Sequence, residues 1–231
     1  MSYWSNVSLD LIAAIWFAAL LGGYRLLTGR PALERRSIVG AVQAHRVAWM
    51  CNMAGRDNRV LDAILLGGLG HGNAFFASTS AIVIGGLIAL VGSGDKAQAF
   101  LEQLPYVAKA SPVLFEIKIL LLIGIFIYAF FKFAWAFRLS HYTGIMIGST
   151  PLLKPDNEAV CRQHAERTAR LIGIAAEHTN SGIRSFYHAI AALGWFFHPL
   201  VFMAATAWVL LILLRRDFFS RSNQVLSGRW P

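Results

Sequence analysis

Charged residues are absent from two long segments of this chain. No Asp, Glu, Lys or Arg occurs from Ala63 to Gly94, and none occurs from Ser185 to Leu214. Two shorter segments, near 9–27 and 113–139, are also mainly apolar. An α-helix needs about 20 mostly apolar residues to cross the hydrocarbon core of a bilayer. The pattern therefore predicts an all-α, polytopic membrane protein with four transmembrane helices.

The two longest segments exceed what a single crossing requires. As one helix, the run that ends at Gly94 would be about 48 Å long, against a hydrocarbon core of about 30 Å. Its first third contains a cluster of glycines, at Gly67, Gly68, Gly70 and Gly72. We therefore expect a bend or a break before Asn73, and a kink at Pro199 in the fourth run.

The expected spans are about 9–27, 73–93, 113–139 and 187–214. The excess length of the second and fourth runs leaves an alternative open. Either run can instead contain a re-entrant hairpin, which would add a fifth crossing.

Two further segments have the pattern of amphipathic helices. In 37–54, apolar residues recur at helical spacing between basic and amide residues, which suits the headgroup layer. In 156–180, a helix is expected to begin after Pro155, with Glu158 and Arg162 as an i,i+4 pair. We expect the first helix to lie at the membrane interface and the second in the cytoplasm.

Composition and charge agree with a membrane protein and suggest its orientation. Hydrophobic residues make up 56% of the 231 residues and charged residues 14%, whereas soluble domains have about 25% charged residues. The net charge of +9 comes from residues beside the spans, so we expect anionic headgroups of the bilayer, and not nucleic acid, as their partners.

Lys and Arg are unevenly distributed between the two sides. Fourteen follow the first and third spans, and seven fall elsewhere. The positive-inside rule then places the large basic loops in the cytoplasm and both termini outside, in a multi-pass protein of the inner cell membrane. Four of the seven are arginines of the C-terminal tail, which would be more favourably placed inside.

Four ionisable residues in or near the spans are candidates for a pathway or an ion pair: Glu116, Lys118, Arg184 and His188. Glu116 and Lys118 are two positions apart, so they point to different faces of their helix. Glu116 is the best single candidate for a protonatable group, whereas Lys118 and Lys132 are spaced to extend to opposite interfaces. Arg184 and His188, one turn apart, either bind lipid phosphate or line a vestibule that attracts anions.

A polar stripe is expected in the second span, at Asn73, Ser78, Thr79 and Ser80. Polar side chains in hydrocarbon need partners, which usually come from another helix. The stripe either lines a path for a solute or ion, or provides hydrogen bonds between packed helices. Hydroxyl groups can also bond to the backbone of the preceding turn, which favours the structural interpretation.

Metal and catalytic chemistry have little support in the sequence. His71, His141 and His188 fall near corresponding ends of three spans, but they have no HxxxH, HxxE or cysteine partner, so we assign no metal ligand and no cofactor. Cys51 and Cys161 lack a CxxC partner and are expected to be reduced. No catalytic triad, phosphate loop or pair of catalytic carboxylates occurs, so nothing indicates an enzyme.

Three blocks of sequence occur in a characteristic order. They are NAFFASTSAIVIGGL, FEIKILLLIGIFIYAFFKF and NSGIRSFYHAIAALGWFFHP, followed by RRDF. Together they resemble the domain of unknown function 599 family, which comprises multi-span membrane proteins. The resemblance covers the chain from Leu9 to about Ser222. It implies four hydrophobic spans and supplies no catalytic residue.

Three functions are compatible with this pattern. The first is a channel or transporter for an ion or small solute, built as a homo-oligomer, because four spans rarely enclose a pathway alone. The second is a non-catalytic scaffold or accessory subunit that packs against a larger membrane partner. The third is a membrane protein that binds haem or a metal.

Overall fold

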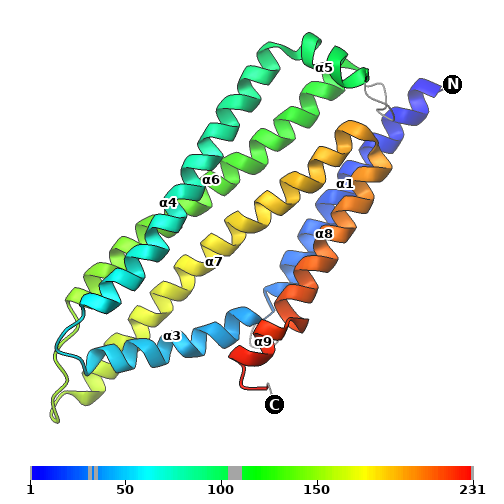
Figure 1. Cartoon of the computed structure of the whole chain (residues 1–231). Helices are drawn as coiled ribbons and strands as arrows, with labels where there is room; N and C mark the ends of the chain where they lie inside the picture. The colour runs from blue at the N-terminus through cyan, green and yellow to red at the C-terminus, as the bar shows by residue number, and fades with distance from the viewer. Residues whose placement is uncertain (1, 31–32, 34–35, 104–110, 230–231) are drawn as a thin grey trace.

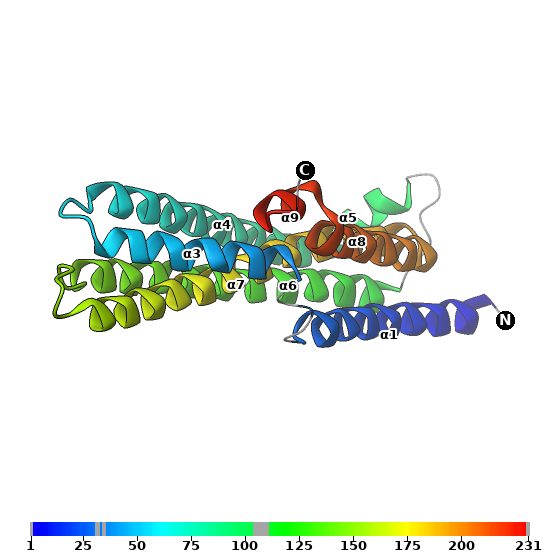
Figure 2. The same cartoon turned by 90° about the horizontal axis from the view of Figure 1, so that it is seen from below.

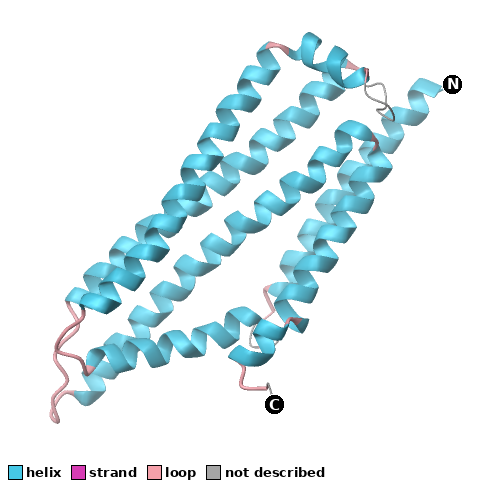
Figure 3. Cartoon of the chain, viewed as in Figure 1, coloured by secondary structure: helices cyan, strands magenta, loops and turns pink. Residues whose placement is uncertain are grey.

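Figure 1 shows a computed structural model of the chain, which describes residues 2–30, 33, 36–103 and 111–229. No strand occurs among these residues (Figure 3), so the all-α class is confirmed. Four helices are long and apolar enough to cross a membrane, which also agrees with the sequence. They are α1 (Ser2–Thr28), α4 (Val60–Gly92), α6 (Pro112–Gly148) and α8 (Pro199–Phe219), the last followed by the short α9 (Arg221–Leu226).

A fifth long helix, α7 (Glu158–Phe197), lies in the middle of the bundle. On one side of α7 lies α6, and α4 packs against α6. On the other side of α7 lies α8, and α1 packs against α8. Figure 1 shows α4, α6, α7 and α8 running in alternate directions, whereas α1 runs parallel to α8. The bundle therefore contains five long, roughly aligned helices, although only four of them are apolar along their length.

The fourth apolar run forms a helical hairpin. α7 ends just before His198, which is extended, and α8 begins just after it. The Nδ1 atom of His198 accepts a hydrogen bond from the backbone N–H of Leu200 at 3.2 Å. Side chains on either side of the turn meet, since the rings of Trp195 and Phe202 stack with centroids 5.0 Å apart.

The expected single span at 187–214 is therefore wrong, and the hairpin alternative describes this run. Pro199 acts as the first residue of a new helix, a position in which its missing N–H costs nothing. Gly194 permits the close return of the chain, because a Cβ there would lie 3.3 Å from Val201. Proline alone does not distinguish a kink from a reversal.

The second apolar run is one unbroken helix. α4 continues through all four glycines, so the break expected before Asn73 is wrong. Each glycine costs only about 1 kcal/mol in a helix interior, whereas a broken helix leaves backbone groups that lipid cannot hydrogen-bond. Gly70 faces α6, and a Cβ there would make an ordinary contact with Ser140 at 3.7 Å.

The amphipathic segments form one end of the bundle, which we call the basic end. α3 (Ile38–Ala54) crosses this end and packs on α7 and α9. A Cβ on Gly173 of α7 would lie 2.5 Å from the side-chain oxygen of Gln43, so a larger residue there would displace this side chain. The segment 156–180 is not a separate helix, because it forms the first half of α7. At the opposite end, α5 (Gly94–Glu102) follows α4, and we call this the α5 end.

The described ends of the chain lie at opposite ends of the bundle in Figure 1. Figure 2 shows the start of α1 at the end away from the loop that joins α3 to α4. α1 begins at the α5 end, whereas α8 and α9 finish at the basic end. The expectation of both termini on the same side does not fit this arrangement. The cause is the hairpin between α7 and α8, which adds one more traverse of the bundle than the sequence pattern indicated.

Candidate functional site

A buried ion pair joins three helices near the α5 end. Asp10 of α1 and Lys118 of α6 are 7% and 3% exposed, and the Lys118 Nζ lies 3.7 Å from an Asp10 oxygen. Nζ also donates to the backbone carbonyl of Trp195 in α7 at 2.9 Å, and the Trp195 indole N–H donates to Asp10. A buried charge pair persists only when such hydrogen bonds satisfy it. The cluster closes this end of the bundle.

A second charged network joins α1, α7 and α8 towards the basic end. Asp217 is buried, and one of its oxygens accepts hydrogen bonds from the Tyr24 hydroxyl at 2.7 Å and from Arg184 at 3.0 Å. The Arg184 guanidinium also lies 5.2 Å from the centre of the Tyr24 ring. Arg216 approaches the other Asp217 oxygen at 3.7 Å. Two arginines therefore offset this one carboxylate.

A cavity of about 330 Å³ opens beside this network, and we call it the basic pocket. Its charged side chains come from α1, α6, α7 and α8, and its rim includes α3. The residues that line it are Arg25, Thr28, Gly29, Ser37, Val39, Lys132, Glu177, His178, Asn180, Ser181, Arg184, Asp217 and Phe218. Three of these are lysine or arginine and two are acidic, and one of the two acids, Asp217, is already paired with Arg184.

Several donors in the basic pocket have no protein partner. The Arg184 Nε and the His178 Nδ1 are buried and make no hydrogen bond to the described residues. Lys132 contacts the face of the Tyr128 ring, with Nζ 5.2 Å from its centre, and makes no ion pair with a described carboxylate. Burial and then the charge of Lys132 lower the pKa of His178 below its usual 6.5. Spare positive charge and spare donors suit an anion with several oxygens.

A second cavity of about 320 Å³ lies between α3, α4, α6 and α7, and we call it the apolar pocket. Most of its wall is apolar. The lining residues are Ile38, Val39, Val42, Arg46, Leu66, Leu69, Asn73, Ser140, Thr143, Ile172, Ala175, Ala176, Thr179 and Asn180.

A family profile described as "Protein of unknown function, DUF599" matches residues 12–222. The chain belongs to the DUF599 family. This confirms the family resemblance drawn from the three sequence blocks, and the four apolar helices agree with the multi-span architecture expected for it. No curated protein and no solved structure matches the chain.

The four ionisable candidates occupy three different places in this DUF599 protein. Glu116 is exposed near the start of α6, away from the basic pocket. Lys118 is buried in the ion pair, so the interpretation that it extends to the interface is wrong. Arg184 lines the basic pocket, and His188 is buried one turn further along α7, with its ring edge-on to Phe17 at 6.2 Å. Glu116 and Arg184 therefore do not share a site.

The polar stripe of α4 is mostly satisfied within its own helix. Thr79 and Ser80 donate to backbone carbonyls four residues earlier, and Ser78 is exposed. Among the described residues, Asn73 alone of the four hydrogen-bonds to another helix, since its Oδ1 accepts from the Thr179 hydroxyl of α7 at 2.7 Å. The stripe is not brought together as a path, which agrees with its structural interpretation.

The histidines proposed for a metal are not clustered. His71 and His141 are exposed, whereas His188 is buried. Across residues 2–30, 33, 36–103 and 111–229, no group of three or more His, Cys, Asp or Glu side chains has the arrangement of a metal site. The described part of this DUF599 protein thus offers no support for the third function.

Sequence reasoning missed the two carboxylates that organise the charged clusters. Asp217 is the only acidic residue after Glu177, and Asp10 is the only one before Glu34. A lone carboxylate at the edge of an apolar run, in a chain of net charge +9, is the signal that singles them out. Lys132 was treated as an interfacial residue, and its place in the pocket depends on packing that the sequence does not reveal.

Proposed function

We propose that this DUF599 protein is a membrane carrier that binds an anion in the basic pocket. The observation that supports this is the charge of the pocket: its lining has three basic residues, Arg25, Lys132 and Arg184, against the two carboxylates of Glu177 and Asp217. Asp217 is also paired with Arg216, which does not line the cavity, so the surroundings carry an excess of positive charge. The Arg184 Nε and the His178 Nδ1 are buried atoms of half-buried side chains, and a buried polar atom without a hydrogen bond is costly unless a ligand or water satisfies it. An anion with several oxygens would satisfy both donors and balance the excess charge.

We also propose that the basic pocket faces the cytoplasm. The direction of α8 brings the four arginines of the tail to the basic end. These four residues then join the fourteen Lys and Arg that follow the first and third predicted spans. The side of the basic pocket has eighteen basic residues in this count, and the other side has three. The positive-inside rule favours a cytoplasmic location for the side with eighteen, which leaves the start of α1 outside.

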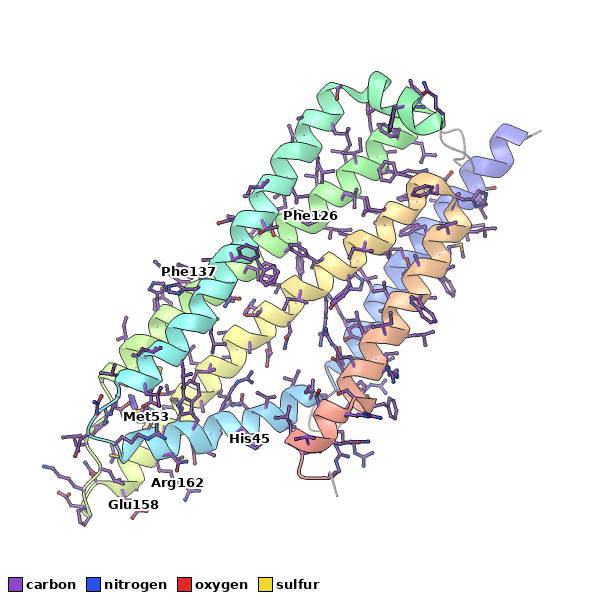
Figure 4. All side chains as sticks on the ribbon, viewed as in Figure 1. His45, Met53, Phe126, Phe137, Glu158 and Arg162 are labelled. Carbon is purple, nitrogen blue, oxygen red and sulfur yellow. The ribbon has the colours of Figure 1, made fainter. Side chains whose placement is uncertain are left out.

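A carrier is favoured over an open channel because an apolar layer separates the basic pocket from the α5 end. This layer contains buried side chains from four helices of the bundle, at Ala13, Phe17, Leu122, Ala189, Ala192, Trp195 and Phe202. Phe126, labelled in Figure 4, packs against it, and its ring meets that of Phe186 with centroids 5.2 Å apart. Beyond it, the Asp10–Lys118 pair closes the α5 end. Passage would then require helices to move.

Sulfate provides a direct test, because it is an anion with four oxygens and a constant charge near neutral pH. We expect purified protein in liposomes to bind and exchange radiolabelled sulfate, and Lys132→Gln to reduce binding at least tenfold. Lys132 has no carboxylate partner among the described residues, so this variant should remain folded. Arg167→Gln, an exposed arginine on α7, is the matched control. Glu116→Gln should also leave exchange unchanged, since Glu116 is far from the pocket.

Two results would point away from a carrier. If wild-type protein binds no sulfate, phosphate or carboxylate, the anion proposal fails. If it binds anions but exchanges none, the scaffold or receptor role is favoured, and the closed apolar layer is the observation that agrees with it.

Self-association remains a proposal. α4 exposes glycines with no heavy atom near the position of a Cβ, including Gly68 and Gly72 at GxxxG spacing, and Gly85 and Gly86 further along. Small residues of this kind let membrane helices approach closely. A homo-oligomer formed through α4 would leave the basic pocket, on the other side of α6 and α7, accessible.

A further inference from the structure

The two cavities of this protein adjoin. Val39 of α3 and Asn180 of α7 line both the basic pocket and the apolar pocket. α3 forms a wall of each, with Ser37 beside the first and Val42 beside the second. A single elongated ligand can therefore lie under α3 with its two ends in surroundings of opposite character.

Arg46 also lines the apolar pocket, and its Nη1 donates to the side-chain oxygen of Gln43 at 3.1 Å. Apart from Arg46 and Asn180, the polar side chains of this pocket are hydrogen-bonded within the protein. The Ser140 and Thr143 hydroxyls donate to carbonyls of their own helix, at 3.0 and 2.9 Å. Thr179 donates to Asn73, whose amide N–H donates to the carbonyl of Leu69 at 3.1 Å. Because these groups are already hydrogen-bonded, what they present to the cavity is mainly their apolar surface. A hydrocarbon chain fits such a wall better than a hydrated ion does.

Two side chains near the middle of α3 fix its position against neighbouring helices. Gln43 donates to the carbonyl of Ala169 in α7 at 3.1 Å, and His45 hydrogen-bonds to the carbonyl of Leu226 in α9 at 2.9 Å. α3 is thus held over α7 by specific contacts, and the space beneath it belongs to the folded structure. An apolar cavity that stays empty costs packing energy, so an occupant would stabilise the protein.

We propose that the ligand of this protein is an anionic amphiphile, with its phosphate or carboxylate head in the basic pocket and its hydrocarbon chain in the apolar pocket. This rests on the proposed function, since it names the class of anion that the basic pocket holds. A small hydrophilic anion uses the basic pocket alone and gives no role to the cavity beside it. Both a lipid of the inner leaflet and a soluble amphiphile have the required chemistry.

Native mass spectrometry of the protein in a non-ionic detergent tests this by comparing four probes. They are glycerol 3-phosphate, decyl phosphate, dioctanoyl phosphatidic acid and dioctanoyl phosphatidylcholine. We expect both of the phosphates that carry chains to bind at least tenfold more tightly than glycerol 3-phosphate. Phosphatidylcholine, with the same chains as phosphatidic acid and no net charge, should bind at least tenfold more weakly than the acid.

Filling the apolar pocket separates the contribution of the chain from that of the head. Ala176→Phe on α7 and Val42→Phe on α3 each place a ring in this cavity. We expect each variant to remove the tenfold gain from the chain and to leave the affinity for glycerol 3-phosphate within twofold of wild type. Ala159→Phe is the matched control, because Ala159 is exposed on the same helix as Ala176. Lys132→Gln should weaken all three anionic probes.

Each outcome has a distinct meaning. Tighter binding of phosphatidic acid than of decyl phosphate assigns the ligand to the bilayer, and the reverse assigns it to a soluble amphiphile. Equal affinity for glycerol 3-phosphate and the chain-bearing phosphates would overturn the inference and leave the proposed anion function intact. Equal affinity for phosphatidylcholine and phosphatidic acid would also overturn the inference. It would likewise be overturned if Ala176→Phe and Val42→Phe both kept the tenfold tighter binding of the chain-bearing phosphates. Failure of every anion to bind would overturn the proposed function itself.

Discussion

At the scale of single residues, one glycine controls the closest contact between two central helices. A Cβ on Gly182 of α7 would lie 2.6 Å from the ring of Phe133 in α6. That ring is fully buried and stacks on Phe76 of α4 with centroids 5.1 Å apart. The ring therefore cannot turn away to admit a methyl group, and the helices would have to separate.

We expect Gly182→Ala to destabilise the protein by about 1–3 kcal/mol, the usual cost of overpacking a core. Thermal unfolding in detergent would measure this as a lower midpoint. Gly124→Ala is the control, since Gly124 of α6 is exposed and has nothing within 4 Å of a Cβ position. A midpoint for Gly182→Ala equal to that of the control would show that α6 and α7 are not packed as described.

His178 gives the basic pocket a pH dependence with a definite sign. Its pKa is lowered by burial and by the charge of Lys132, so the free pocket holds a neutral imidazole at pH 7.5. Protonation adds positive charge, and a bound anion favours the protonated form. The other charged groups that line the pocket are Arg25, Lys132, Glu177, Arg184 and Asp217.

We therefore expect sulfate affinity to rise as the pH falls from 7.5 to 5.5, by at most roughly tenfold per pH unit for one proton. Titration calorimetry at several pH values would measure it. His178→Gln should flatten this dependence, which separates the histidine from the carboxylates of the same pocket. An unchanged slope in the variant would assign the effect to another group.

At the scale of elements, the sequence and the structure agree where local composition decides the outcome. Uncharged runs of sufficient length become helices because lipid leaves no other way to satisfy the backbone. The same principle explains why α4 passes through its glycines unbroken. The hairpin at His198 and the central position of α7 were not predicted, because the polar first half of α7 hides its length. Which face of α7 meets α6 or α8 depends on distant side chains such as Phe133 and Asp217.

The candidate site was predicted only in part, because the sequence reveals unusual charges but not the direction in which they point. Arg184 was singled out because a charge beside an apolar run is uncommon, and it does line the basic pocket. Glu116 fits the same rule and yet faces outward, because the rule does not specify direction. The apolar pocket has no sequence signal, since its lining combines residues from four helices that are far apart in the chain.

The Asp10–Lys118 pair fixes how α1, α6 and α7 meet at the α5 end. We expect Lys118→Met to destabilise the protein by about 3–5 kcal/mol, because it leaves the Asp10 carboxylate buried without its cation. Adding Asp10→Asn should recover most of this loss, since the amide oxygen still accepts from the Trp195 indole. Thermal midpoints of the single and double variants would measure the coupling. A double variant as unstable as the sum of both singles would show that the two charges do not interact.

At the scale of the whole molecule, the directions of the five long helices determine which segments share a side of the membrane. α7 is about 60 Å long, roughly twice the hydrocarbon core, and its polar half lies at the basic end with α3. The basic end therefore extends beyond the bilayer, and the basic pocket lies where this extension meets the membrane. That position suits a ligand with its head in water and its chain in an apolar medium.

This topology makes a specific prediction about accessibility in intact cells. Single cysteines at Ala99, Gln163 and Ser222 would report on α5, on the polar half of α7 and on α9, and all three positions are exposed. Cys51 and Cys161 are first replaced by alanine and serine. An impermeant thiol reagent should label Ala99→Cys from outside, whereas Gln163→Cys and Ser222→Cys should react only after the cells are permeabilised.

Labelling of Ser222→Cys together with Ala99→Cys in intact cells would place both on one side, which the parallel α1 and α8 do not allow. Labelling of Gln163→Cys and Ser222→Cys without Ala99→Cys would preserve the bundle and invert it in the membrane, so that the basic pocket would open to the outside.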